Sequence, residues 1–343
     1  MALHRALLAS PFRTLSPPEA SYFYVPFYSR LLYADKKASA AQRAFAANAT
    51  ASLAGCLRAS RWWQRSRGKD HLAVLSSTRD PKVLYGAAWP LVQRALLLRI
   101  EASDRRFGER GLLRREGQMV VPYYVPFFEE DHAVAKEHKT HSVCFLGSDT
   151  NGLRRKALKA LKGVPNAVLR LGTAEGPAAA EQEARGERGG GGGKAARKAA
   201  RKAARRQAER RRTVASRATL RRCKLCLVPA GITASSRRFY EALSASCVPI
   251  LLADAFEPAF TAPLPLERYA VRAPQRQPEA LPHVVGRALA EWPRLFAAVR
   301  EVRSAFDLGM GTDVAAAPRC DALHAVVSEL SLRFGSRAAG GTG

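Results

Sequence analysis

Short apolar runs alternate with helical patterns through the first third of this 343-residue chain. Helical spacing of apolar residues covers the alanine-rich segment Ala38–Arg65 and also Ala88–Ile100. Strand-like composition covers three segments: Ser21–Phe27, Leu72–Ser76 and Met119–Val125. Strands that alternate with helices are typical of α/β domains with a mostly parallel sheet. We therefore predict an α/β domain over residues 1–135.

The alternation resumes near residue 141 and predicts a second α/β domain over residues 136–335. Its first elements are expected to be a strand at Val143–Leu146, a helix at Leu153–Leu161 and a strand at Ala167–Leu171.

The clearest pattern in this second domain is RCKLCLVPAGITASSRRFYEALSASCVPILLAD at 222–254. The apolar runs Lys224–Pro229 and Val248–Ala253 read as strands, and Arg237–Ser246 between them has helical spacing. Two buried strands joined by a helix form a right-handed βαβ unit. Ligands of parallel sheets bind beyond the carboxyl ends of the strands, so we expect a site at Ala230–Arg238.

A low-complexity insertion at 173–218 interrupts the second domain. It contains Gly189–Gly193 and then KAARKAARKAARRQAERRR, in which no apolar side chain is larger than alanine. Such a segment cannot bury a core face, so we expect it to be exposed. The chain carries a net charge of +27, and residues 185–222 alone hold 15 Lys or Arg against 2 Glu. About half of the excess charge is therefore local to this segment.

This local charge leaves open an alternative function, which is nucleic-acid binding through residues 194–212. However, the run lacks the interleaved aromatic residues that stack on bases, and no zinc-finger or RNA-recognition motif accompanies it. Nucleic acid is thus the less favoured partner. The same charge is suited to contact with an acidic polysaccharide or an acidic surface.

The six cysteines are too few for a dense disulfide framework in a chain of this length. Cys144, Cys226 and Cys247 fall in apolar runs, where we expect free thiols that pack as small hydrophobic side chains. Cys223 and Cys226 form a C-x-x-C pair, but no second pair follows at the spacing of a zinc site. No apolar run approaches the ~18 residues of a membrane span.

Two predicted junctions between a loop and a helix have the chemistry of an anion site. At both Gly147–Arg155 and Gly231–Arg238, a helix N-terminus with free N–H groups coincides with arginines, which suits a diphosphate. Gly231 permits a close backbone approach or a positive φ. Ser235 or Ser236 is expected to cap the second helix, and both are candidate ligand contacts.

Five segments in a fixed order resemble the exostosin-like glycosyltransferases, family 47 of the sugar transferases. They are RTLSPPEASYFYVPFY at 13–28, GKDHLAVLSS at 68–77, MVVPYYVPF at 119–127, HSVCFLGSDTNGLRRKALKALKG at 141–163, and the 222–254 segment with its continuation to 260. The resemblance implies two facing Rossmann-like domains of the GT-B type, with the N-terminal domain incomplete because its first strand is missing. It also implies an inverting glycosyltransferase that moves a sugar from a UDP-sugar to a polysaccharide or glycoprotein glycan. Members of the family are usually anchored in the Golgi membrane. An inactive transferase-like protein remains a further alternative.

The resemblance assigns roles to residues of the second domain. Arg155 aligns with the family's arginine after the first strand and loop of this domain, which implies a diphosphate contact; otherwise it belongs to a solvated helix face. Arg238 and Glu241 match the family's Arg-x-x-Glu, and Glu241 would accept hydrogen bonds from ribose hydroxyls. The structural alternative is an i,i+4 salt bridge between Arg237 and Glu241.

The catalytic base is the least determined part of the sequence interpretation. Asp70 and His71 stand at a predicted strand entry of the acceptor-side domain, and either could take a hydroxyl proton. A hydrogen bond at the strand end explains them equally well. No Asp-x-Asp occurs in the chain, so we expect a metal-independent enzyme without a cofactor. His132, His138 and His141 match no standard metal-site spacing and are expected to lie in an interdomain linker.

Overall fold

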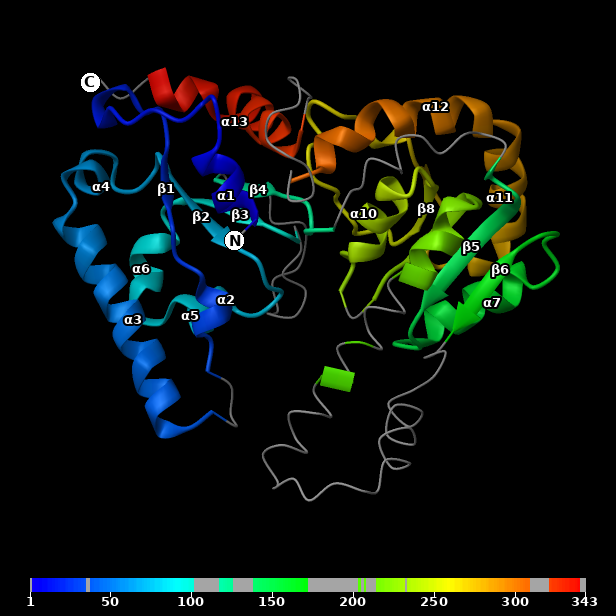
Figure 1. Cartoon of the computed structure of the whole chain (residues 1–343), viewed down its shortest axis with the longest axis horizontal. Helices are drawn as coiled ribbons and strands as arrows, with labels where there is room; N and C mark the ends of the chain where they lie inside the picture. Colours follow the sequence, from blue (N-terminus) through cyan, green and yellow to red (C-terminus); the bar gives the residue numbers. More distant parts are fainter. Residues whose placement is uncertain are drawn as a thin grey trace.

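A computed structural model describes residues 2–34, 38–101, 117–125, 138–171, 203–204, 207, 214–231, 233–308 and 321–339. Two parallel β-sheets, each flanked by helices, make up this part of the chain (Figure 1). The α/β class and the two Rossmann-like units that the sequence predicts are thereby confirmed.

The first sheet contains four parallel strands in the order β1-β2-β3-β4. The strands are β1 (Phe23–Val25), β2 (His71–Leu75), β3 (Leu96–Arg99) and β4 (Gln118–Val120). The helices of this half are α1 (Ala2–Leu8), α2 (Ser29–Leu32), α3 (Ala40–Ala59), α4 (Arg61–Ser66), α5 (Pro81–Tyr85) and α6 (Trp89–Val92).

Two helices predicted for this half differ from the observed elements. The long helix at Ala38–Arg65 is divided at Ser60, whose hydroxyl accepts a hydrogen bond from the backbone N–H of Trp63 and so caps α4. The prediction of one helix over Ala88–Ile100 is wrong in its second half, because Leu96–Arg99 forms β3. All four residues of β3 are buried, and three consecutive leucines before Arg99 have no periodicity that separates strand from helix.

The second sheet contains five parallel strands in the order β6-β5-β7-β8-β9. The strands are β5 (His141–Gly147), β6 (Val168–Leu171), β7 (Cys223–Pro229), β8 (Val248–Leu252) and β9 (Val271–Arg272). The labelled helices in this part of the sequence are α7 (Gly152–Leu161), α10 (Arg237–Ser244), α11 (Leu281–Ala290), α12 (Trp292–Val302) and α13 (Ala322–Ala339). The predicted βαβ unit is present, since β7 and β8 pair in parallel on either side of α10 in the chain.

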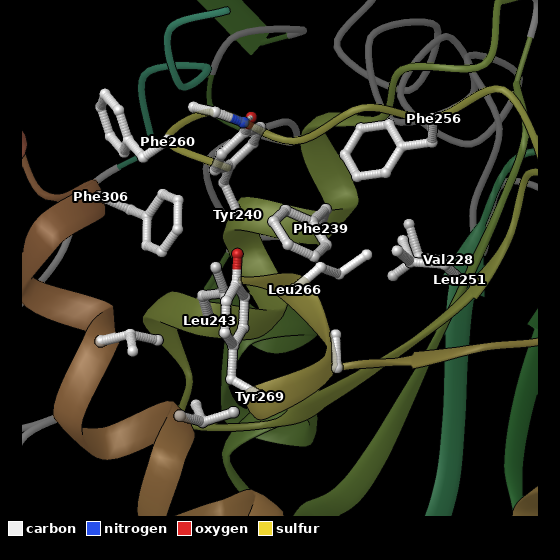
Figure 2. Packing of buried hydrophobic residues seen from close by; sticks show 14 of the residues in the cluster. Val228, Phe239, Tyr240, Leu243, Leu251, Phe256, Phe260, Leu266, Tyr269 and Phe306 are labelled. Carbon is white, nitrogen blue, oxygen red and sulfur yellow. Dashed lines mark hydrogen bonds between the residues drawn. The ribbon is translucent and has the colours of Figure 1, made fainter. Parts of the chain in front are cut away.

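Helix α10 is anchored by a cluster of aromatic and aliphatic side chains. Figure 2 shows Phe239, Tyr240 and Leu243 among the buried side chains around Phe256 and Phe306. The ring centroids of Phe239 and Phe256 lie 5.1 Å apart, and those of Tyr240 and Phe306 lie 5.9 Å apart. Because Phe239, Tyr240 and Leu243 are fully buried, the rotation of α10 about its axis is fixed, and its polar side chains face away from the core.

Four of the cysteines form two disulfides beside this helix. Cys144 is linked to Cys223, and Cys226 is linked to Cys247. The expectation of free buried thiols is therefore wrong for Cys144, Cys226 and Cys247. Apolar burial of a thiol and of a disulfide leaves the same sequence pattern, and the pairing depends on which strands become neighbours. Cys56 is free and exposed.

The two sheets face each other across contacts at the carboxyl ends of β3 and β4. The hydroxyl of Ser235, just before α10, donates a hydrogen bond of 3.0 Å to the carbonyl of Ile100, just after β3. The rings of Tyr123, after β4, and Tyr240 lie 6.0 Å apart. Helix α13 returns to pack against α1 (Figure 1). The strands of the two sheets fall within the predicted ranges 1–135 and 136–335, whose boundary lies outside the described residues.

Most of the predicted insertion at 173–218, including most of the basic run 194–212, also lies outside the described residues. The described chain is continuous again from Val214, and residues 214–221 are helical. Leu220 in this helix is buried against the cluster that contains the disulfide cysteines. The packed part of the second half thus begins a few residues before the predicted end of the insertion.

Candidate donor-binding site

Two helices begin side by side at the carboxyl edge of the second sheet. Helix α7 follows β5 and helix α10 follows β7, and these two strands are neighbours. Asn151 joins the two junctions: its Oδ1 accepts from the backbone N–H of Arg154 at 3.2 Å and so caps α7. Its Nδ2 donates to the carbonyls of Ala230 at 3.1 Å and Gly231 at 2.9 Å, in the loop before α10. One side chain therefore fixes the loop before α10 against the start of α7.

Arg154 lies between the two junctions. Its Nη1 donates to the carbonyl of Ser148 at 2.8 Å, and its guanidinium lies over the ring of Phe145 at 5.7 Å. Burial, followed by the neighbouring charge of Arg238, lowers the pKa of Arg154, while Asp149 opposes that shift. The buried Nε has no hydrogen-bond partner within the described chain. A half-buried cation with an unpaired donor beside a second cation is an environment that an anion would stabilise.

Gly231 has the close-approach role that the sequence suggests. A Cβ atom at this position would lie 3.3 Å from Nη2 of Arg154, so the glycine leaves room for the guanidinium. The structure gives Gly231 no positive φ, so close approach, and not a left-handed backbone, accounts for the residue.

Arg238 and Glu241 lie together on the polar side of α10. Nη1 of Arg238 is 2.9 Å from Oε2 of Glu241, and Nε of Arg237 is 3.2 Å from Oε1 of the same carboxylate. The i,i+4 salt bridge that was the structural alternative is thus present together with the Arg-x-x-Glu pair. Arg238 and Glu241 each keep about a quarter of their side chain exposed, so both can contact a ligand.

The two serines before α10 have different partners. Ser236 is the N-cap, and its hydroxyl accepts from the backbone N–H of Arg238 at 3.2 Å. Ser235 is engaged by the first half of the molecule, through the carbonyl of Ile100 and the carboxylate of Glu101. Of the two predicted contacts, Ser236 lies at the helix start, and Ser235 joins the two halves.

Arg155 is placed differently from its neighbour Arg154. Its Nη1 lies 2.8 and 2.7 Å from the two carboxylate oxygens of Asp149, and 61% of its side chain is exposed. This is the solvated helix face that was the alternative to a diphosphate contact. Arg154, one residue earlier, lies beside Gly231, where its guanidinium is better placed for the diphosphate contact that the sequence interpretation assigned to Arg155.

Asp70 and His71 lie at the amino end of β2, whereas the site occupies the carboxyl ends of strands. The His71 ring stacks on Phe23 with 5.0 Å between centroids and meets Trp63 edge-on at 4.7 Å. Asp70 accepts hydrogen bonds from Arg65 and Ser66, and its Oδ1 lies 2.6 Å from Nδ1 of His71. This placement favours the structural alternative over a catalytic base.

Three participants at the site were not identified from the sequence: Asn151, Glu101 and Tyr123. The asparagine stands before a predicted helix and could have been assigned as its cap, but its bonds to the second loop depend on the sheet order. Glu101 and Tyr123 meet Ser235 only because the two sheets face each other.

The described part of the chain holds no cluster of three or more His, Cys, Asp or Glu side chains that would suit a metal ion. His132 lies outside the described residues, and the expectation of a linker is wrong for His141, which is the first residue of β5. None of the described helices has the length and hydrophobicity to cross a membrane.

Comparison with known proteins shows the family to which this arrangement belongs. The model of the exostosin GT47 domain matches residues 1–288, which include both sheets. The chain belongs to the exostosin GT47 family. The resemblance that the five ordered segments carry is thus confirmed.

Individual relatives of this exostosin GT47 chain are plant glycosyltransferases. A probable β-1,4-xylosyltransferase of Arabidopsis thaliana is 34% identical over 134 residues, which cover 36% of the chain and 30% of that protein. A probable glucuronoxylan glucuronosyltransferase of the same plant is 24% identical over 281 residues, 76% of the chain and 51% of that protein. A probable arabinosyltransferase, also from Arabidopsis thaliana, is 23% identical over 255 residues, 72% of the chain and 48% of that protein. The chain thus matches about half or less of the length of these relatives.

Proposed function

We propose that this exostosin-family chain is an inverting glycosyltransferase that moves a sugar from a UDP-sugar to a polysaccharide or glycoprotein glycan. The observation that carries the proposal is the pair of neighbouring cations, Arg154 and Arg238, at the adjoining starts of α7 and α10. Helix N-termini and fixed guanidinium groups are the features that bind a diphosphate and stabilise it as it leaves.

The roles of the individual residues follow from their positions. Arg154, Arg238 and the first backbone N–H groups of α10 would hold the diphosphate, with Ser236 fixing the helix start. The Glu241 carboxylate would accept hydrogen bonds from the two ribose hydroxyls, while its arginine partners keep it charged. These cations supply charge where the diphosphate departs, so we propose that the transfer needs no metal ion and no other cofactor.

The donor sugar and the acceptor are proposed from the relatives. Their names describe transfer of xylose, glucuronic acid and arabinose, and one of them acts on glucuronoxylan. We infer a pentose or a uronic acid as the donor sugar and a cell-wall-type polysaccharide as the acceptor.

We also propose a location for the protein in the Golgi. Two disulfides in one sheet fit an oxidising compartment of the secretory pathway, which agrees with the Golgi location expected from the family. The cytosol, which keeps thiols reduced, would not preserve these bonds.

Calorimetric titration of UDP tests the proposed donor site. We expect UDP to bind the wild-type chain and Glu241→Ala to weaken binding about 10- to 100-fold, the effect of losing hydrogen bonds to a charged group. Glu291→Ala is the matched control, because Glu291 also pairs with an arginine, Arg294, but stands at the start of α12 near the other edge of the sheet. A folded wild-type chain that gives no heat with UDP would reject the proposal and favour an inactive transferase-like protein.

Measurements of turnover with different nucleotide sugars identify the donor. Release of UDP from UDP-xylose, UDP-glucuronic acid and UDP-arabinose, with and without xylan oligosaccharides, identifies the sugar that the site accepts. Deletion of residues 186–212, which stops short of the packed helix at 214–221, should leave UDP binding intact. Loss of UDP binding on this deletion would contradict a donor site built from α7 and α10.

A further inference from the structure

Exposed cations are concentrated around helix α4 of the first half. Residues 58–69 contain five Lys or Arg and neither Asp nor Glu. All five are exposed, and we call them the α4 cations: Arg58, Arg61, Arg65, Arg67 and Lys69. Arg65 pairs with Asp70, with 2.9 Å between Nη2 and Oδ2. The other four have no ion pair with a carboxylate of the described chain.

The half-buried side chain of Trp62 holds two of these arginines in place. Its ring stacks on Phe23 with 5.6 Å between centroids. The guanidinium carbon of Arg61 lies 4.6 Å from the Trp62 ring centroid, and that of Arg65 lies 5.1 Å from the same centroid. Arg65 also lies over Phe23, at 5.6 Å. Arginines that stack on aromatic rings are partly ordered before a ligand binds, so less side-chain entropy is lost on binding.

The stacked arginines favour a particular kind of anion. Stacking engages the face of a guanidinium and leaves the N–H groups at its edge able to donate. Within the described chain the guanidinium of Arg61 donates no hydrogen bond. The planar edge of a guanidinium matches the two oxygens of a carboxylate, which it binds through two parallel hydrogen bonds. Five cations in one short segment suit a partner that carries several carboxylates.

The α4 cations lie away from the proposed donor site. Helix α4 precedes β2 and so lies at the amino end of that strand, whereas the start of α10 meets the carboxyl ends of β3 and β4. The five residues of β2 span ~16 Å between these two edges. Figure 1 shows α4 at the outer end of the first half, far from the second sheet. A partner that occupies both places must therefore be a long polymer.

Two other classes of polyanionic partner fit this surface less well. A membrane-surface helix needs an apolar face, but α4 has six residues, and none of the exposed large apolar side chains of the described chain falls within 58–69. Single-stranded nucleic acid needs aromatic rings on which bases stack, and the ring of Trp62 is already stacked with Phe23 and the two arginines.

We propose that the α4 cations bind the carboxylates of an acceptor polysaccharide that carries uronic acid. The inference rests on the proposed function, which takes a polysaccharide as the acceptor. The surface holds a part of the polymer remote from the reacting end, so it contributes to binding of long acidic acceptors and not to the transfer step. Its loss therefore raises KM for such acceptors and leaves kcat unchanged.

The first test removes three α4 cations that have no ion pair, as Arg58→Gln, Arg61→Gln and Lys69→Gln in one chain. Calorimetry compares binding of glucuronoxylan oligosaccharides with binding of the same oligosaccharides after their carboxyl groups have been reduced. We expect the triple variant to raise the Kd for the acidic oligosaccharides roughly 10-fold, as the sum of three exposed charge contacts. Binding of the reduced oligosaccharides and of UDP should change less than about twofold.

A control variant removes the same amount of charge elsewhere. Lys159→Gln, Lys162→Gln and Arg287→Gln in one chain replace three exposed cations of the second half. This variant should bind the acidic oligosaccharides as wild type does. In wild type, added salt should weaken acidic binding, and the triple variant should show a smaller salt dependence.

A single substitution tests the role of stacking and guards against misfolding of the triple variant. Arg61→Lys keeps the charge but removes the planar guanidinium, so we expect the Kd for acidic oligosaccharides to rise about threefold. An unchanged Kd would show that charge alone acts here and would overturn carboxylate recognition by the stacked arginine.

The remaining outcomes also decide the proposal. Wild-type affinity in the triple variant, or equal affinity of wild type for acidic and reduced oligosaccharides, would overturn it. So would tighter binding of single-stranded DNA or of anionic vesicles that the triple variant loses, since the surface would then serve another partner. A wild-type chain that binds no UDP rejects the proposed function, whereas the loss of acidic-oligosaccharide binding in the triple variant would still support this surface.

Discussion

Two consecutive arginines show how much a single position matters at this site. Arg154 is half-buried beside Gly231 and near Arg238, whereas Arg155 is exposed and paired with Asp149. Replacement of Arg154 by Met should raise the Kd for UDP about 10- to 100-fold, because a charge-assisted hydrogen bond to the diphosphate is lost. Arg155→Met, which breaks only an exposed ion pair, should change the Kd less than about threefold. Calorimetric titration of UDP against both variants measures these changes. A larger increase in Kd for Arg155→Met than for Arg154→Met would contradict the assignment of Arg154 to the diphosphate.

His71 provides a prediction about pH at the same scale. Burial lowers the pKa of His71 below its ordinary value of 6.5, and the neighbouring Asp70 only partly offsets this while Arg65 adds to it. Below about pH 6.5 the unfolded chain therefore binds a proton that the folded chain does not. The stability that the neutral ring provides is complete above pH 6.5 and is lost as the pH falls, by at most ~1.4 kcal/mol per pH unit.

The measurement for His71 is urea unfolding of wild type and His71→Phe between pH 5 and 7.5. Phenylalanine keeps the stack on Phe23 and cannot be protonated. The variant should therefore lose less stability than wild type as the pH falls through this range. The pKa of Asp70 is lowered below 3.8, because the bonds from Ser66, Arg65 and His71 outweigh its burial, so Asp70 titrates below this window. Equal slopes for the two proteins would contradict the buried neutral state of His71.

At this scale, the sequence predicted the location of the candidate site better than the individual residues that form it. The succession of a strand, a loop and a helix start predicted a ligand site at Ala230–Arg238, and the family's Arg-x-x-Glu pattern added Glu241. These residues remain predicted donor contacts. The choice between Arg154 and Arg155 could not be made in this way. Adjacent helical residues point about 100° apart. Gly231, in the neighbouring loop that decides which of them is buried, follows Arg154 by 77 residues in the sequence.

Helix α10 shows how one element is fixed at both ends. At its C-terminus, Nζ of the buried Lys139 donates to the carbonyl of Ala245 at 2.9 Å. The buried Arg303 donates to the carbonyl of Ser244 at 2.5 Å and to the hydroxyl of Ser246 at 3.0 Å. Cations at a helix C-terminus complement its dipole, while the N-terminus is left to an anion. The short α10 is thus held firmly where it would meet the donor.

Removal of the Arg303 charge should destabilise the fold. Arg303→Met fills similar space but leaves the carbonyl of Ser244 and the hydroxyl of Ser246 without this donor. We expect a loss of about 2–3 kcal/mol in the free energy of unfolding, the size of a buried hydrogen bond to a charged group. Urea denaturation measures it, with the exposed Arg287→Met as control. A loss below about 0.5 kcal/mol would show that the helix end does not depend on this side chain.

Elements were predicted best where the pattern was long or bounded by turn residues. The strands β5, β7 and β8 and the helices α7 and α10 lie within a few residues of their expected bounds. The error over Ala88–Ile100 arose because Leu96–Arg99 is buried on every side in the sheet, so neither a period of 2 nor one of 3.6 could appear. Only the pairing of β3 with β2 and β4 makes it a strand.

The disulfides act on the whole second half of the molecule. They close segments of 79 and 21 residues; one connects β5 with β7, and the other connects β7 with the residue directly before β8. Loss of one native disulfide typically costs about 2–5 kcal/mol, so reduction should lower the thermal midpoint by several degrees. Peptide mapping without reductant should recover Cys144 linked to Cys223 and Cys226 linked to Cys247. Complete alkylation of all six cysteines in unfolded, unreduced protein would contradict these pairs.

The arrangement of the whole molecule brings the parts of the candidate site together. The carboxyl ends of β3 and β4 meet the start of α10, so one sheet offers Glu101 and Tyr123 while the other offers Arg154, Arg238 and Glu241. Sequence patterns predicted both α/β units. The facing contacts through Ser235 were not predictable, since they depend on the packing of segments more than 130 residues apart.

A structure of the chain in complex with UDP would test the central claim most directly. The account predicts that the diphosphate lies at the start of α10, with phosphate oxygens ~3 Å from the first backbone N–H groups of that helix and from Arg154 or Arg238, and with the ribose against Glu241. A diphosphate bound elsewhere, out of reach of both arginines and of the α10 N-terminus, would contradict it.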